Sequence, residues 1–287
     1  MYLRFLLAKL YMEALTEQAS ARNVRECLKS LPQDLDAMYE LTLQRIESQG
    51  KGQAALADQI LTWLSCAPNP LELHELLEAL AIHEYDQHLT SDDIPSIDRM
   101  LSACWGLVMV EGEYIKSVRL IHYTTREYFS KWGLYSSRKH HGYITCMLMT
   151  YLDICYPEHY PQYYFAATED EAYGFMWDEA HEEMPDGGPK FPLIPYTFST
   201  LGLHIGQILH ASDDSPPTSV AMCTQRSVKE TERNLKWYLR RLSRDSAFAA
   251  AVDGIIRNAC AWTNDKGIAL EKSTYPTALQ AAVMIGR

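Results

Sequence analysis

Several patterns are missing from this sequence, and each absence excludes a class of protein. No apolar run approaches the roughly 18 residues that a membrane-spanning helix needs. Basic residues are scarce, since 26 Lys and Arg stand against 37 Asp and Glu, for a formal net charge of -11. Binding to nucleic acid or to an anionic membrane depends on accumulated Lys and Arg. We therefore expect a soluble chain with no nucleic-acid partner and no membrane partner.

Catalytic and metal-binding signatures are missing as well. There is no P-loop, because the Gly-Lys-Gly at 50–52 lacks the upstream glycine and the following Ser or Thr, and there is no GxSxG elbow of a serine hydrolase. In "HEYDQH", His83 and His88 lie five apart and miss the i, i+4 spacing of the zinc motif HExxH. The "WDEAH" at 177–181 spells a helicase-type Walker B motif without the P-loop that it needs. We expect no enzyme, no catalytic residue, no metal site and no cofactor held by this chain alone.

The cysteines form no CxxC pair and lie among apolar residues. There are seven of them: Cys27, Cys66, Cys104, Cys146, Cys155, Cys223 and Cys260. This usage is typical of buried, reduced thiols and predicts a cytoplasmic protein. The N-terminal run is not a secretory signal, because Lys9 and Glu13 interrupt its apolar residues.

Helical periodicity dominates what the sequence does contain. With 287 residues and 47% hydrophobic content, the chain can bury a core in one to three domains. Leucines recur at helical spacing in residues 3–15, and apolar residues do so on both sides of Pro32. The "SQGKGQ" at 48–53 is interpreted as a linker. We predict a mainly α protein.

A different pattern follows in residues 51–135. Three helices are predicted, over 54–66, 71–82 and 97–105. Two β-like runs come next, joined by a polar stretch that contains Gly112, and this is the pattern of a β-hairpin. A final helix is predicted to begin near Thr124. Three helices followed by a hairpin is the order of a winged helix.

A winged helix often binds DNA, and the charge of this one decides against that alternative. The helix that would enter the groove offers only Arg99 as a donor, beside Asp98. Residues 51–135 hold 6 Lys and Arg against 12 Asp and Glu, a net of -6. Such a surface repels the phosphate backbone, which supplies most of the affinity for DNA.

Beyond residue 135, two more helices are predicted, over 143–156 and over 191–209. Pro192 and Pro195 lie near the start of the second, where proline is tolerated. A Tyr-rich, acidic stretch separates the two helices, and "ASDDSPPTS" after the second one marks a loop.

Several of these segments occur in the same order in a known family. They are "LLAKLYMEAL", "LKSLPQDLDAMYELTLQRI", "PNPLELHELLEALAI", "LSACWGLVMVEGEYIKSVRLIHYTTREYF" and "FPLIPYTFSTLGLHIGQIL". On these segments the chain resembles fungal NACHT-ankyrin proteins, which are STAND NTPases related to the animal NOD-like receptors. The middle block resembles the module known as the GPI inositol-deacylase winged helix domain.

The resemblance implies a domain organisation. Residues 1–50 would be the helical C-terminal part of a NACHT module, 51–135 the winged-helix domain, 136–265 a helical region with an acidic Tyr-rich insertion, and 273–287 a partial ankyrin repeat. The repeat rests on Thr277, Ala278, Leu279 and Ala282, which match the TPLHxAA pattern, and on Gly286 after it. The nucleotide-binding core would precede Met1.

The function implied by the resemblance is non-catalytic. The chain would be a regulatory and protein-interaction segment of a signalling protein, and its winged helix would act as a nucleotide-state switch. ATP or ADP would bind to the full-length parent, and the partners would be the NACHT nucleotide-binding domain and the ankyrin array. The alternative is a cryptic hydrolase. Ser, His and acidic residues are present, but no motif identifies three of them as a catalytic triad.

One candidate site residue emerges, His122 in "RLIHYTTREYF". It shares a strand face with Val118 and Leu120, because side chains alternate along a strand. Thr124 and Glu127 fit a capping box, which predicts a helix N-terminus two residues after His122, where an anion is favoured. In NOD-like receptors a similar histidine contacts the β-phosphate of ADP. The resemblance implies that role for His122 when the missing P-loop domain is supplied; the alternative is a core histidine bonded to a backbone carbonyl.

Overall fold

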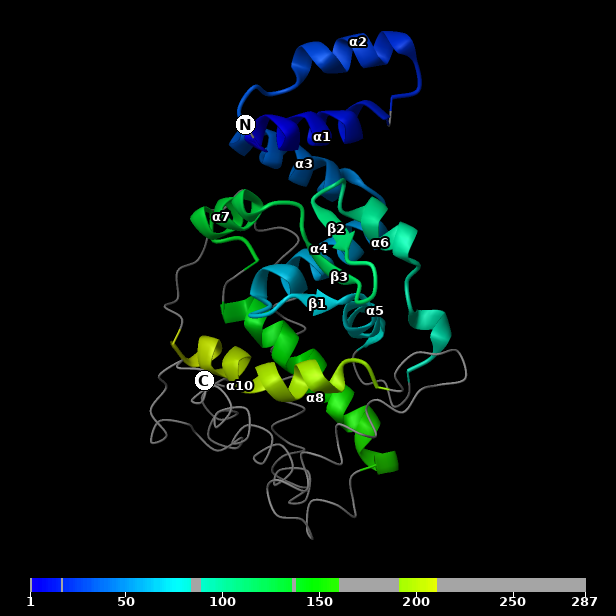
Figure 1. Ribbon diagram of the computed structural model, residues 1–287, viewed down its shortest axis with the longest axis vertical. Helices are drawn as coiled ribbons and strands as arrows, with labels where there is room; N and C mark the ends of the chain where they lie inside the picture. The colour runs from blue at the N-terminus through cyan, green and yellow to red at the C-terminus, as the bar shows by residue number, and fades with distance from the viewer. Residues whose placement is uncertain (1, 17, 84–88, 136–137, 160–190, 211–287) are drawn as a thin grey trace. The chain divides into compact units, whose positions relative to one another are not determined.

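The computed structural model describes residues 2–16, 18–83, 89–135, 138–159 and 191–210 (Figure 1). Within them the chain divides into two compact units, one containing 2–73 and 95–135 and the other containing 74–83, 89–94, 138–159 and 191–210. The described part is mainly helical with one small sheet, as predicted. The partial ankyrin repeat, the acidic Tyr-rich stretch and the "WDEAH" segment lie outside the described residues.

The first unit contains most of the winged helix and the helices that precede it. Its helices are α1 (Tyr2–Thr16), α2 (Ala21–Ser30), α3 (Leu35–Ser48), α4 (Lys51–Cys66), α6 (Ile97–Ala103) and α7 (Tyr123–Lys131). Its strands are β1 (Leu71–Glu72), β2 (Val108–Glu111) and β3 (Ser117–Leu120). Helix α4 packs against α3, α6 and β3, and its fully buried Trp63, Ile60 and Leu61 lie at the centre of the core.

Short polar side chains explain where several helices begin. Ser20, Asp34 and Ser96 each precede a helix and accept a hydrogen bond from the backbone N–H three residues later. Such an N-cap satisfies a donor that has no partner inside the helix. Helices α2 and α3 therefore form on either side of Pro32, as the periodicity predicts.

The linker predicted at 48–53 is wrong, because α3 runs to Ser48 and α4 begins at Lys51. Gly50 occupies the N-cap position, and Gly52 lies in the first turn of α4. The N–H groups of a first turn have no partner within the helix in any case, so a glycine there interrupts no hydrogen-bond ladder. Two residues, and not six, connect the helices.

The sheet has the order β1-β3-β2, and all of its pairs are antiparallel. Val118 pairs with Leu71 on one side and with Val110 on the other. Gly112, with φ of 111°, forms the turn of the hairpin, and a side chain there would collide with the carbonyl of Ile115. The predicted hairpin is confirmed, but the helix predicted from residue 71 begins at Leu73 because β1 precedes it.

The second unit contains α5 from its second residue onward, a short 3-10 helix and two long helices. Their bounds are α5 (Leu73–Ala81), η1 (Ser91–Asp93), α8 (Arg138–His159) and α10 (Ile194–His210). Helices α8 and α10 pack against each other and cross in Figure 1. Glu78 of α5 accepts hydrogen bonds from the Tyr151 hydroxyl at 2.7 Å and from the Leu193 backbone N–H at 3.0 Å, so it connects three segments of this unit.

Candidate functional site

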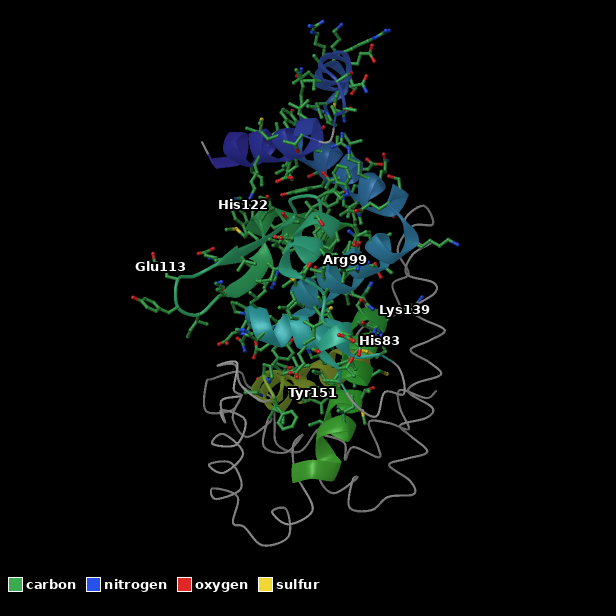
Figure 2. The ribbon with its side chains drawn as sticks, turned by 90° about the vertical axis from the view of Figure 1, so that its right-hand side faces the viewer. His83, Arg99, Glu113, His122, Lys139 and Tyr151 are labelled. Atoms are coloured by element: carbon green, nitrogen blue, oxygen red, sulfur yellow. The ribbon has the colours of Figure 1, made fainter. Side chains whose placement is uncertain are left out.

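His122 lies at the junction between β3 and α7, at the base of the hairpin whose tip bears Glu113 (Figure 2). The strand face that leads to it is buried at Val118 and Leu120, as the alternation predicts, and His122 itself is half-buried. Its backbone is still extended, with φ of -158° and ψ of 154°.

The N-cap of α7 is His122, which corrects the predicted capping box. The helix begins at Tyr123, and the His122 Nδ1 accepts a hydrogen bond from the backbone N–H of Thr124 at 3.4 Å. The Thr124 hydroxyl lies 2.9 Å from the same Nδ1 and 2.8 Å from the hydroxyl of Tyr39 on α3. Thr124 is thus the second residue of the helix and not its N-cap. Its hydroxyl is used by two other side chains, Tyr39 and His122.

A hollow of about 440 Å³ lies beside this junction, entirely within the first unit. It is lined by Leu64, residues 67–71, Met109 and Glu111 of β2, residues 118–123 and Arg126. The volume is in the range of small-ligand sites. His122 is therefore part of the wall of a hollow and is not enclosed in the core.

Two arginines line the hollow, and they differ in how they are held. Arg119 forms an ion pair with Glu111 across the hairpin, so its charge is largely compensated. Arg126, in the first turn of α7, donates from Nη2 to the Leu64 carbonyl at 2.9 Å and pairs with no carboxylate among the described residues. The wall that contains His122 thus has a net positive charge and lies at the positive end of the α7 dipole, an environment that favours an anion.

The cysteines of the winged helix offer no nucleophile. Burial raises the pKa of the Cys66 thiol to about 12, although Arg126 lowers it in part. Burial also raises the pKa of Cys104 far above its usual range. Because the thiolate is the reactive form, both side chains are inert near neutral pH.

A second group of histidines lies in the other unit, between α8 and α10. The Nδ1 atoms of His141 and His204 are 2.9 Å apart, and the His204 Nε2 lies 3.2 Å from the Tyr196 hydroxyl. Burial lowers the pKa of both histidines, and each keeps the neutral form at pH 7. This group holds two helices together and lines no described hollow.

Sequence reasoning identified His122 but missed several residues near it. Tyr39 lies 85 positions from Thr124 in the sequence, and no local pattern links the two. Arg126 was visible as a basic residue in a first turn, which is the one available signal. His83 and His122 belong to different units.

In the described ranges, no three His, Cys, Asp or Glu side chains come together as a metal site. None of the helices in that same part of the chain combines the length and the apolar character that crossing a membrane requires.

Comparison with known proteins gives one match. The family model described as "GPI inositol-deacylase, winged helix domain" matches residues 43–138. Searches of curated proteins and of solved structures returned no match. The matched range contains α4, α5, α6, the β2–β3 hairpin and α7 in the order that the sequence pattern predicts, and also β1, which was not predicted. The chain therefore contains a winged helix domain, and His122 lies inside it.

Proposed function

We propose that this chain is a non-catalytic regulatory and protein-interaction segment of a NACHT-ankyrin type of signalling protein. Its winged helix domain would sense the nucleotide state of a NACHT domain in the longer parent. The partners are that nucleotide-binding domain and an ankyrin array, and the nucleotide, ADP or ATP, belongs to the parent. The proposal rests on the arrangement around His122.

That arrangement leaves one imidazole nitrogen for a ligand. Nδ1 caps α7, while Nε2 has no hydrogen-bond partner among the described residues. The residue lines a hollow that also contains Arg126 and the start of a nine-residue helix. A phosphate placed there would accept from Nε2–H and interact favourably with Arg126.

The proposed mechanism is a population shift. A domain that contacts ADP through His122 binds the ADP state more tightly than a state without that contact, and the difference in free energy favours a closed arrangement. Nucleotide exchange removes the contact and releases the winged helix. In this mechanism the chain makes and breaks no bond.

ADP affinity tests the proposal. The full chain is fused behind the nucleotide-binding domain of a NACHT protein that has the same winged helix module, and ADP binding is measured by calorimetry. We expect His122→Ala to weaken ADP binding by roughly tenfold, because a hydrogen bond to a charged group is worth about 1.5 kcal/mol or more.

His74→Ala provides the matched control, because His74 is exposed on α5 and outside the hollow. This variant should bind ADP as the wild type does. Equal ADP affinities for the wild type and His122→Ala would show that the histidine is not a nucleotide sensor.

A further inference from the structure

Four side-chain groups form a continuous hydrogen-bonded relay that starts at Thr125 of α7, passes through Tyr39 of α3 and ends at the hollow. The Thr125 hydroxyl donates to the Tyr39 hydroxyl at 3.0 Å. The Tyr39 hydroxyl lies 2.8 Å from the Thr124 hydroxyl, which lies 2.9 Å from the His122 Nδ1. Tyr39 is fully buried, and Thr125 is fully buried as well. The relay therefore has its start in the core and its end at the wall of the hollow.

The directions of these hydrogen bonds follow from which atoms can donate. A backbone N–H can only donate, so the Thr124 N–H makes the His122 Nδ1 an acceptor. The oxygen of Tyr39 already accepts from Thr125, which leaves the Tyr39 proton for the Thr124 oxygen. The Thr124 proton then points to Nδ1. Every hydroxyl donates once, and the chain of donors ends at the imidazole.

A neutral imidazole has one protonated and one unprotonated nitrogen. Since Nδ1 accepts, the proton must be on Nε2, the nitrogen left for a ligand. Burial raises the pKa of Tyr39, against the effect of its hydrogen bonds with Thr124 and Thr125, so the phenol keeps the proton that the relay requires.

We infer that Tyr39 and Thr124 are positioning residues that hold His122 as its Nε2–H tautomer. Loss of the Tyr39 hydroxyl would leave the Thr124 oxygen free to accept from an Nδ1–H. The donor at the hollow would then be lost in part of the molecules. This inference deepens the proposed function and rests on it for the identity of the ligand, but the tautomer itself requires no ligand.

The test measures the tautomer directly in the full chain. Histidine is labelled with ¹⁵N, long-range proton–nitrogen correlations are recorded at pH 8, and the His122 signals are assigned by their loss in His122→Ala. We expect the wild type to show a protonated Nε2 and an unprotonated Nδ1. In Tyr39→Phe the tautomer ratio should shift five- to tenfold toward Nδ1–H, as expected for the loss of one hydrogen bond.

Tyr128→Phe is the matched control, because Tyr128 packs against Tyr39 with ring centroids 5.1 Å apart but its hydroxyl is no part of the relay. It should leave the His122 tautomer unchanged. Thr124→Val should shift the ratio in the same direction but no further than Tyr39→Phe, because the backbone N–H of residue 124 still donates to Nδ1 and no hydroxyl oxygen remains to accept from an Nδ1–H. Thr124→Ser, which keeps the hydroxyl, should restore the wild-type ratio. The Thr124 pair decides the question if Tyr39→Phe fails to fold.

A protonated Nδ1 in the wild type would overturn the inference. So would a tautomer ratio that is the same in Thr124→Val, Thr124→Ser and Tyr128→Phe. These outcomes differ from a failure of the proposed function, which would appear as an unchanged ADP affinity in His122→Ala while the tautomer still responds to Thr124→Val.

Discussion

Two histidine sites in this protein show how the same side chain is used in opposite ways. His141 and His204 lie between two long helices, with His204 only 1% exposed, and they bond each other and Tyr196. His122 is half-buried at the end of a strand, and only one of its nitrogens is bonded among the described residues. The first arrangement satisfies its polar atoms internally, while the second keeps a donor available.

The comparison teaches that the number of bonded ring nitrogens is more informative than burial alone. Both nitrogens of His204 have protein partners, so a ligand has nothing to gain there. His122 uses Nδ1 as an Asp or Asn would be used at an N-cap, and its Nε2 remains for a second role. The two sites belong to different units.

The largest effect should come from removing the buried histidine. His204→Ala leaves a cavity between α8 and α10 and takes away the partner of His141, so we expect it to lower the free energy of unfolding of this unit by about 3 kcal/mol. Hydrogen exchange of the amides in α8 and α10 measures this unit separately from the winged helix. The exposed His74 serves as a control, since its replacement by Ala should cost less than about 0.5 kcal/mol. A cost for His204→Ala as small as that control would contradict the buried-pair interpretation.

Acid should be the next largest perturbation of the second unit. Burial lowers the pKa of His141 and of His204 below the ordinary 6.5. The two imidazoles also lie side by side, with their Nδ1 atoms 2.9 Å apart. As the pH falls below 6.5, these two histidines therefore bind protons in the unfolded chain but stay neutral in the folded unit. Stability is fully present above pH 6.5 and is lost as the pH falls below it, by about 2 kcal/mol for each histidine between pH 7 and pH 5.

Other titratable groups near this pair must be considered in the measurement. His140 is adjacent, with a pKa lowered to about 4 by burial and by the charges of His141 and Lys139, so it adds to the loss in acid. Glu78 acts in the opposite direction in the same pH range. The measurement is therefore made in a Glu78→Gln background, where the exchange rates of α8 and α10, divided by the intrinsic rates, should rise as the pH falls. An exchange rate that falls on acidification more than the intrinsic rate does would contradict the prediction.

Much of the fold could be predicted from the sequence because its signals are local. Period-2 alternation around Gly112 indicates the hairpin, and helical periodicity around Pro32 indicates two helices. Strand β1 could not be predicted, since two residues are too few to show alternation and its pairing with β3 is non-local. The linker at 48–53 was wrong because glycines near a helix start have the same appearance as glycines in a loop.

The place of His122 at a strand–helix boundary was predicted, but its hydrogen bonds were not. His122 could be located because a strand pattern ends and a helix pattern begins at that point. Its role as N-cap could not be predicted from the sequence, because Thr124 is the better cap by residue type. Only the buried Tyr39 explains why the Thr124 hydroxyl is used elsewhere. His141 and His204 are 63 positions apart in the sequence, so no local pattern predicts that they pair.

Alkali should affect Glu78 in the sense opposite to the histidines. Burial raises the pKa of this carboxyl to about 7, against the hydrogen bonds from Tyr151 and Leu193. Its contribution to stability is fully present below pH 4.5 and is lost as the pH rises through 7. Glu78→Gln keeps an acceptor oxygen without the charge, so at pH 8 we expect it to stabilise the second unit by roughly 1.5 kcal/mol. Hydrogen exchange of α8 at pH 5 and pH 8 checks this, and an equal effect of the substitution at both values would contradict it.

The smallest effect should come from His122, and it separates the two roles of that side chain. His122→Ala removes the cap of α7 and should lower stability by about 0.5 to 1 kcal/mol, well below the cost of His204→Ala. His122→Asn should recover most of the lost stability, because Asn is among the best N-caps, yet it has no imidazole Nε2–H to offer a phosphate.

Urea unfolding monitored through amide exchange in α7 gives the stability, and the fusion with a nucleotide-binding domain gives the ADP affinity. If Asn restores stability while ADP binding stays weak, capping and ligand contact are separate functions of His122. If Asn restores both the stability and the ADP affinity, His122 acts through the helix cap alone. His122 and His204 would then differ in where they lie, and not in whether a ring nitrogen is available to a ligand.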